Sequence, residues 1–190
     1  MSTEYESVPL AAEHDVARFN CGVPSLNAWL AEQALRAQRA GTARTFVWST
    51  TEAPRQVWAY FSLAPTELAR DSLSRGQSSG YSTMPGYLLA RLAVHAGLRG
   101  RGYGGQLLVD ALSRAAAAAE AGGGRLVVVD ALDEAAASFY RHYEFTPVKD
   151  NPRRLVLKMA NVRKLLSYPS RGHRSGAHAG SNPSRSSRPA

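Results

Sequence analysis

The feature that most constrains this fold is a glycine-rich turn, Arg-Gly-Arg-Gly-Tyr-Gly at 99–104, between a predicted strand and a predicted helix. The strand covers 87–95, and the helix runs from about 104 to 121, where glycines 122–124 end it. The continuous apolar run at 125–131 then predicts a strand that is buried on both faces. Strand, turn, helix and strand form a βαβ unit, so the two strands are expected to lie in one sheet.

The rest of the chain predicts further strands at 8–10, 45–49, 57–63, 145–148 and 154–159. A helix capped by Ser25 is expected to run to about Arg39, and another, capped by Asp133, to about His142. The segment 65–85 is rich in Ser, Gly and Pro and predicts a mobile loop with one short helix. The predicted fold class is therefore α/β (α+β), with a mixed central sheet and helices on both faces.

Composition separates one domain from a tail. A chain of 190 residues suits a single domain, which we predict at 1–167, followed by a disordered basic tail rich in Ser, Gly, Pro and Arg at 168–190. The net charge is +8, and the tail carries four of the 23 basic residues and no acid. The remaining excess suits a phosphate-bearing ligand or nucleic acid, and equally an ordinary solvated surface.

Several classes of protein are excluded or disfavoured. The single cysteine, Cys21, rules out an internal disulfide framework, and no Cys/His cluster has zinc spacing, so no metal site is predicted. The first ten residues lack the basic and apolar parts of a secretory signal, and no apolar run approaches a membrane span. We therefore expect a cytoplasmic protein without membrane contact.

The glycine turn fits more than one anion-binding motif. A P-loop would end in Gly-Lys-Ser/Thr, which is absent. Gly100, Gly102 and Gly105 satisfy the Gly-x-Gly-x-x-Gly spacing of dinucleotide sites, but the acidic residue of the next strand, Asp130, comes later than the ~20 residues expected there.

The turn also resembles the signature of the GNAT superfamily of N-acetyltransferases, Arg/Gln-x-x-Gly-x-Gly/Ala, through Arg99, Gly102 and Gly104. The resemblance implies the GNAT acyl-CoA N-acyltransferase fold and acetyl-CoA as co-substrate, with the pyrophosphate held by backbone amides of the turn. It further implies a bulge near Ala93–Val94, where the strand backbone pairs with the pantetheine arm. The implied cofactor-binding residues are Leu92, Ala93, Val94, Arg99, Gly100, Arg101, Gly102, Gly104 and Gly105.

A second motif, Phe-Tyr-Arg-His-Tyr-Glu-Phe at 139–145, is similar to the family's Phe-Tyr-x-x-x-Gly-Phe, with Glu144 in place of the glycine. The resemblance implies that Tyr140 lies near the coenzyme sulfur, where its hydroxyl can act as general acid. The alternative is that Tyr140 is a packing aromatic, and Tyr143 is a weaker candidate for the acid.

Segments 19–30, 91–94 and 153–159 follow the order seen in one GNAT branch, the tRNA-acetylating toxins of type II toxin–antitoxin systems. The resemblance implies acetylation of the α-amine of aminoacyl-tRNA, which blocks translation, neutralisation by a ribbon-helix-helix antitoxin, and a homodimer. The sequence departs from the branch at Ala90, where glycine is common, and at His95, where aspartate is usual.

Arginines are the candidate contacts to tRNA phosphates, although each one alone is equally consistent with an ordinary surface. The main candidates are Arg36, Arg39, Arg44 and Arg91, followed by Arg75, Arg153 and Arg154. Two other functions remain open: acetylation of a small amine or a protein N-terminus, and a non-catalytic module that binds coenzyme A or a partner. No carboxylate base is evident, but an α-amine with a pKa of about 7.7–8.0 needs little help to lose its proton.

Overall fold

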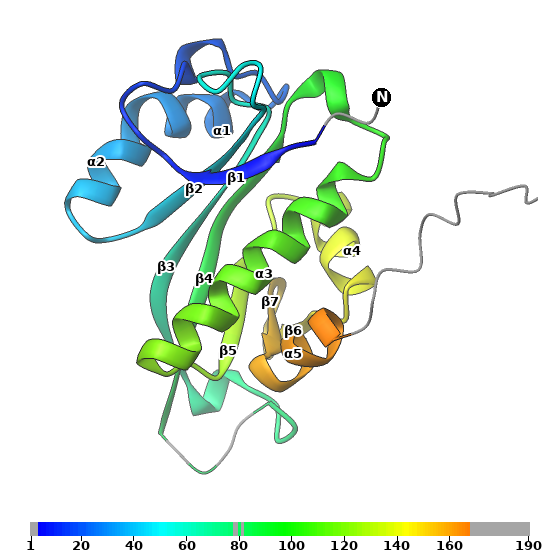
Figure 1. Ribbon diagram of the computed structural model, residues 1–190. Coiled ribbons are helices and arrows are strands. Elements are labelled where there is room, and N and C mark those ends of the chain that lie inside the picture. Colours follow the sequence, from blue (N-terminus) through cyan, green and yellow to red (C-terminus); the bar gives the residue numbers. More distant parts are fainter. Residues whose placement is uncertain (1–3, 78–79, 81, 168–190) are drawn as a thin grey trace, which may run out of the picture.

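The computed structural model describes residues 4–77, 80 and 82–167, and these form one seven-stranded sheet surrounded by helices (Figure 1). The spatial order of the strands is β1-β2-β3-β4-β5-β7-β6. Their bounds are β1 Glu6–Pro9, β2 Arg44–Ser49, β3 Ala59–Ala69, β4 Thr83–Val94, β5 Leu126–Asp130, β6 Thr146–Val148 and β7 Asn151–Lys158. The predicted tail, 168–190, lies outside the described residues.

The predicted βαβ unit is confirmed. β4 and β5 pair in parallel, the other neighbouring strands pair antiparallel, and α3 (Tyr103–Gly122) joins β4 to β5. The predicted apolar face of α3 is buried throughout, since Leu107, Leu108, Ala111, Leu112 and Ala115 are at most 1% exposed. The middle of β5 is equally buried, as expected for a strand covered on both faces.

Helices cover both faces of the sheet, which confirms the predicted fold class (Figure 1). On one face α3, α4 (Glu134–His142) and α5 (Met159–Ser167) enclose the largest apolar cluster. On the other face a continuous helical segment formed by α1 (Pro24–Ala28), η2 (Trp29–Gln33) and α2 (Ala34–Arg39) packs over β2, β3 and β4. The buried Tyr60 hydroxyl donates a hydrogen bond of 2.8 Å to the Leu26 carbonyl, which fixes α1 on the sheet.

The prediction of a loop across 65–85 was wrong over much of its length. β3 continues to Ala69 and β4 begins at Thr83, so the two strands form a long hairpin whose connection includes the short helix η3 (Arg70–Ser72). Pro65 and Pro85 are tolerated because β2 pairs with β3 only as far as Leu63, and β5 pairs with β4 only from Gly86. The Pro85 carbonyl still accepts the Arg125 N–H at 2.8 Å, but neither proline replaces an N–H that these ladders use.

Two helix predictions also need correction. The N-cap of α1 is Val23, and Ser25 lies inside the helix, because Pro24 occupies the first position, where a missing N–H costs nothing. The helix α5 was not predicted, although Met159, Val162 and Leu165 recur at helical spacing. By contrast, Asp133 caps α4 as predicted, through a 2.7 Å hydrogen bond from the Ala136 N–H.

The two parallel strands separate part-way along their length. Pairing of β4 with β5 ends at Leu89 opposite Val129, while β4 stays paired with β3 up to Val94. The irregularity in β4 lies at Ala90, the extra residue between the pairs Leu63–Leu89 and Ser62–Arg91. The bulge predicted near Ala93–Val94 was thus placed three residues too late, since pairing there is regular. A gap opens in the sheet where β5 ends.

Candidate active site

A pocket of about 460 Å³ lies where β4 and β5 separate. Both strands contribute walls, and α1 and α4 close its two sides. The lining residues are Ser25, Leu26, Leu88, Leu89, Ala90, Arg91, Leu92, Asp130, Ala131, Leu132, Ala136 and Tyr140. Beyond the last β4–β5 pair, the edge of β4 that faces β5 has no ladder partner among the described strands. The Ala90 carbonyl already accepts a 2.6 Å hydrogen bond from Arg91 Nη1, so the remaining backbone groups of this edge are the ones a ligand can pair with.

Tyr140 is the ionisable side chain that α4 brings to this pocket. Its residue is only 8% exposed, and burial raises the pKa of its hydroxyl above the ordinary value. Within the described residues, no hydrogen-bond partner of this hydroxyl was found. The hydroxyl therefore holds its proton at neutral pH and is free to give it to a bound group.

Tyr143 lies elsewhere. A Cβ added at Gly105 would be 2.0 Å from the Tyr143 hydroxyl, so this ring covers the first turn of α3. Phe139 covers the neighbouring Gly104 in the same way, 3.7 Å from an added Cβ. Of the two tyrosines considered for the general acid, the structure brings only Tyr140 to the pocket.

The glycine turn has the geometry of an anion cradle. Gly100 and Gly102 have φ of +72° and +80°, a region that favours glycine, and nothing lies within 4 Å of a Cβ added at either. Gly102 caps α3, and the first turn of this helix carries no acidic residue and no side-chain cap, so its N–H groups keep their affinity for an anion. These features fit a pyrophosphate held by backbone amides.

The side chain of Arg99 is committed to the protein. Its Nη2 donates a hydrogen bond to the Cys21 carbonyl, and its guanidinium lies 3.0 Å from where a Cβ of Gly22 would be. The Oδ1 atom of Asn27, in α1, accepts a hydrogen bond of 2.9 Å from the Cys21 N–H. Arg99 thus ties the glycine turn to the loop that starts α1, and α1 forms one wall of the pocket.

The other predicted cofactor residues are placed unevenly. Leu92 lines the pocket. Ala93 is buried in the apolar cluster between the sheet and α1, and Val94 is half-buried at the end of β4. Arg101 is exposed in the glycine turn.

The candidate tRNA contacts fall into two groups. Arg91 lines the pocket, with its guanidinium 5.2 Å from the centre of the Trp29 ring. Arg154 lies beside the pocket and pairs with Asp130 through two contacts of 2.9 and 3.0 Å. The remaining candidates, Arg36, Arg39, Arg44, Arg75 and Arg153, are exposed and do not line the pocket.

The three departures from the family pattern each have a local explanation. Ala90 is the bulged residue of β4. The His95 Nδ1 accepts the Gly97 N–H at 3.1 Å and so caps the following turn, as an aspartate could. Glu144 keeps the left-handed conformation that a glycine would adopt, with φ of 66°.

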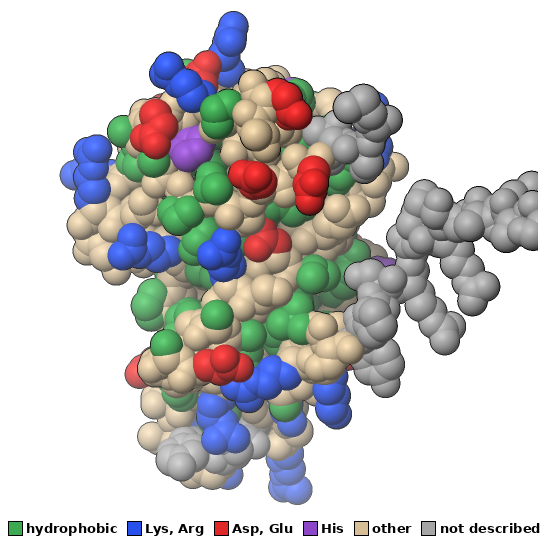
Figure 2. Space-filling view, viewed as in Figure 1, with side chains coloured by type: hydrophobic (Ala, Val, Ile, Leu, Met, Phe, Trp, Pro, Cys, Tyr) green, Lys and Arg blue, Asp and Glu red, His purple; other side chains and the backbone are tan. Residues whose placement is uncertain are grey.

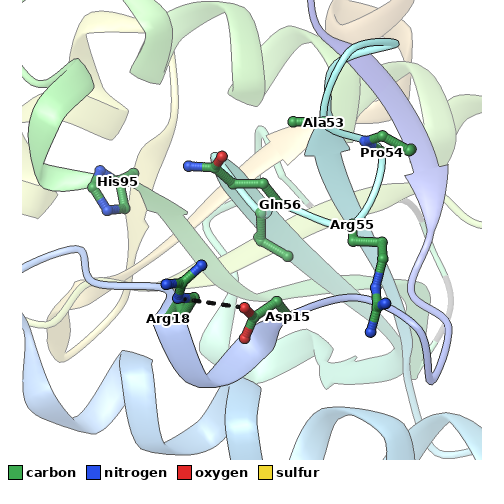
Figure 3. A pocket seen from close by; sticks show the side chains of 8 residues that line it. Asp15, Arg18, Ala53, Pro54, Arg55, Gln56 and His95 are labelled. Carbon is green, nitrogen blue, oxygen red and sulfur yellow. Dashed lines mark ion pairs between the residues drawn. The ribbon is translucent and has the colours of Figure 1, made fainter.

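Another cavity, of about 510 Å³, lies away from this pocket (Figure 3). It is bounded by η1 (Val16–Arg18), the β2–β3 loop and His95. Figure 3 shows Arg18 and Gln56 directed toward the interior and Arg55 directed away. Arg18 is paired with Asp15 at 3.6 Å, and neither the glycine turn nor Tyr140 contributes to the lining. Size alone therefore does not identify the site.

Sequence reasoning missed much of the pocket wall, notably Ser25, Leu26 and the segment 130–132. One available signal was Leu132, a large apolar residue directly after the strand predicted at 125–131, and the structure leaves it 57% exposed. Among the described residues no cluster of three or more His, Cys, Asp or Glu is placed to hold a metal ion. In the same part of the chain, no helix has the length and apolar character needed to cross a membrane.

Comparison with known proteins decides the family. The model of the acetyltransferase (GNAT) domain matches residues 28–147. A tRNA-acetylating toxin of Mycobacterium tuberculosis is 36% identical over 153 residues, which cover 80% of this chain and 90% of the toxin. The chain belongs to the GNAT acetyltransferases, in the branch of the tRNA-acetylating toxins.

Two solved structures show how closely this GNAT chain follows its relatives. AtaT complexed with acetyl-methionyl-tRNAfMet superposes with a TM-score of 0.79 at 28% identity, covering 86% of this chain and all of AtaT (100%). A tyrosine-to-phenylalanine mutant of AtaT, bound to acetyl-CoA and to the C-terminus of the antitoxin AtaR, gives 0.75 at 26% identity, with 86% and 99% covered.

Proposed function

We propose that this chain transfers the acetyl group of acetyl-CoA to the α-amine of an aminoacyl-tRNA and so acts as a translation-blocking toxin. The observation that carries the proposal is the pocket at the β4–β5 separation, whose wall contains Tyr140, a hydroxyl without a hydrogen-bond partner among the described residues. The tRNA-acetylating relative and the tRNA complex of AtaT support the choice of acceptor.

Acetyl-CoA would supply the thioester, and the chain would hold it by backbone. The amides of Gly100 to Gly105 suit its pyrophosphate, and the unpaired edge of β4 from Ala90 to Leu92 suits its amide-bearing arm. Fixed N–H donors of this kind also favour the oxyanion that develops during acyl transfer.

Tyr140 supplies the proton that the reaction needs. Transfer forms the C–N bond of the amide and breaks the C–S bond of the thioester, and the Tyr140 hydroxyl gives its proton to the departing sulfur. The proton released by the amine returns the hydroxyl to its neutral state through solvent, so the proton count closes. Burial raises the pKa of this hydroxyl, so it is protonated before the reaction and again after it.

The partners follow the same branch. We propose a ribbon-helix-helix antitoxin that binds and neutralises the protein, a homodimer in solution, and a cytoplasmic location. The complex of AtaT with the C-terminus of AtaR supports an antitoxin partner. Exposed arginines, among them Arg36, Arg39 and Arg44, would contact tRNA phosphates.

The test is transfer of label from acetyl-CoA to charged tRNA, with uncharged tRNA as the matched control. We expect label only on the charged pool, and sequencing of the labelled tRNA then names the acceptor. Label on small amines or on protein N-termini but not on charged tRNA would replace the acceptor. Absence of label on every acceptor, with coenzyme A bound tightly, would indicate a non-catalytic binding module.

A further inference from the structure

A second pocket, of about 430 Å³, has a basic wall that the reaction does not use. We call it the basic pocket. It is lined by Gln77, Met84, Gly124, Arg125, Leu126, Lys158, Met159, Ala160 and Arg163, with three cationic side chains and no carboxylate. Figure 2 shows Lys and Arg side chains gathered over the lower end of the molecule, where Figure 1 places α5 and the start of β5.

The fold itself brings the three cations together. Leu126 pairs with Lys158 in the β5–β7 ladder, so Arg125 and Lys158 lie at the same end of two neighbouring strands. The Met159 N–H donates a hydrogen bond of 2.8 Å to the Arg125 carbonyl, and this bond holds the start of α5 against Arg125. Arg163 follows Met159 by four residues, one helical turn, and so lies on the same side of α5.

The three cationic side chains have no polar partner among the described residues. Arg125, Lys158 and Arg163 are all exposed, and within residues 4–77, 80 and 82–167 none of their side chains forms an ion pair or a hydrogen bond. Arg154, on the same strand as Lys158, is in contrast paired with Asp130. Three like charges around one concave surface repel one another, and an anionic ligand relieves that repulsion.

The basic pocket and the acetyl-transfer pocket lie at opposite ends of β5. Leu126 lines the former and Asp130 the latter, and the four residue steps of β5 from one to the other span about 13 Å at ~3.3 Å per residue. Met84, Leu126 and Leu88 belong to one apolar cluster, so both pockets border the same face of the sheet. An RNA strand carries one phosphate per nucleotide, so this distance corresponds to a few nucleotides from the acceptor amine.

The geometry points to the basic pocket as a phosphate-binding subsite for the RNA strand whose 3′ end carries the aminoacyl group. This inference rests on the proposed function, because it needs a substrate with a phosphate backbone that extends from the acceptor amine. Its contacts would add salt-sensitive affinity and register without reading the base sequence.

The test uses two double mutants that remove the same charge. Arg125→Gln/Arg163→Gln removes two cations of the basic pocket, and Arg18→Gln/Arg55→Gln removes two exposed arginines of the cavity in Figure 3. Affinity for fluorescently labelled uncharged tRNA is measured by anisotropy between about 50 and 200 mM salt, the range in which phosphate contacts show most clearly. The KM for charged tRNA and the Kd for acetyl-CoA are measured on the same proteins.

We expect the basic-pocket mutant to bind tRNA roughly tenfold more weakly, with the slope of log affinity against log salt reduced by about 1 to 2. Its KM for charged tRNA should rise in proportion, while kcat and the Kd for acetyl-CoA stay unchanged. Arg125→Lys/Arg163→Lys should restore affinity and slope, which separates lost charge from a damaged fold.

Wild-type affinity and slope in Arg125→Gln/Arg163→Gln would overturn the subsite. An equal loss in Arg18→Gln/Arg55→Gln would overturn it as well, because net charge alone would then explain the effect. Weaker binding of the antitoxin with unchanged tRNA binding would assign the surface to a protein partner instead. Should wild-type protein fail to acetylate charged tRNA, the proposed function fails, and the tRNA-binding arm still decides the subsite.

Discussion

The two halves of β4 differ in what surrounds them. From Gly86 to Leu89 the strand is paired on both edges, with β3 and with β5. From Ala90 to Val94 it is paired only with β3, and its other edge borders the acetyl-transfer pocket. One strand therefore serves stability in its first half and chemistry in its second, and mutations in and around the two halves should separate these effects.

The largest expected effect is on the chemistry of the open half. Tyr140→Phe removes the proposed proton donor without changing the packing of the ring, so kcat should fall about 10²- to 10⁴-fold while the free energy of unfolding changes little. Steady-state kinetics with charged tRNA and urea unfolding measure the two quantities.

Tyr143→Phe is the matched control for this tyrosine, because it removes a hydroxyl that lies over Gly105 and outside the pocket. Its kcat should stay within about threefold of wild type. A Tyr140→Phe enzyme that keeps wild-type turnover would show that another group, or solvent, protonates the sulfur.

In the closed half the largest effect should be on stability. A Cβ added at Gly86 would lie 2.4 Å from the Leu126 carbonyl oxygen, a backbone atom that cannot move without disturbing the β4–β5 pair. Gly86→Ala should lower the free energy of unfolding by about 2–3 kcal/mol, the cost of overpacking a tight contact. Urea denaturation is the direct measurement.

Gly76→Ala provides the control, since its added Cβ would meet only the Ser74 hydroxyl, at 4.0 Å. It should change the free energy of unfolding by less than about 0.5 kcal/mol, as surface substitutions usually do. Equal losses in Gly86→Ala and Gly76→Ala would mean that the close approach of the two parallel strands is not what restricts position 86.

The pH dependence should be governed by the substrate and not by Tyr140. Burial raises the pKa of the Tyr140 hydroxyl, so the group keeps its proton as the pH rises and is not lost as an acid below about pH 10. The acceptor amine loses its proton near pH 7.7–8.0, so kcat/KM should rise roughly tenfold between pH 6.5 and 8 and then level off. A decline in kcat/KM between pH 8 and 9.5, with folded protein, would contradict the burial of this hydroxyl.

Sequence alone located the closed half of β4 better than the open half. The glycine turn, α3 and β5 were predicted within a residue because apolar periodicity and glycines define them locally, whereas the strand predicted at 87–95 began four residues later than β4 does. The pocket wall was not, since it depends on where two strands stop pairing. That point is set by the bulge at Ala90 and by the end of β5, and neither has a local signal in the sequence.

The contact between Arg99 and Cys21 could not be predicted from the sequence for a similar reason. The place of Arg99 in the glycine motif was predicted, but its bond to the Cys21 carbonyl joins residues 78 positions apart and cannot be inferred from spacing. Such contacts between distant segments also underlie the basic pocket, whose cations come from the residue before β5, from β7 and from α5.

Arg99 gives a prediction of intermediate size. Arg99→Leu removes the hydrogen bond between the glycine turn and the loop before α1, a charge-assisted bond worth about 1.5 kcal/mol. The KM for acetyl-CoA should rise about tenfold, while Arg99→Gln, which keeps an N–H donor, should stay within about threefold. An equal rise in both mutants would show that the charge of Arg99, and not its bond to Cys21, supports cofactor binding.

The smallest expected effect lies in the turn that follows Tyr140. Glu144 has φ of 66°, and the turn is closed by hydrogen bonds from Glu144 N–H to the Arg141 carbonyl (3.0 Å) and from Phe145 N–H to the Tyr140 carbonyl (3.2 Å). A side chain in this left-handed conformation costs about 1–2 kcal/mol, partly offset by the lower chain entropy of a non-glycine residue when unfolded. Glu144→Gly should therefore raise the free energy of unfolding by about 0.5–1 kcal/mol without changing kcat.

Asp150 provides the comparison for Glu144, because it also has a positive φ, of 59°, and aspartate tolerates this conformation better than glutamate does. Asp150→Gly should therefore stabilise less than Glu144→Gly in the same urea titration. If Glu144→Gly instead lowered the free energy of unfolding, or changed kcat, the glutamate side chain would be contributing to the position of Tyr140. The turn would then belong to the chemistry of the open half of β4 and not merely to its support.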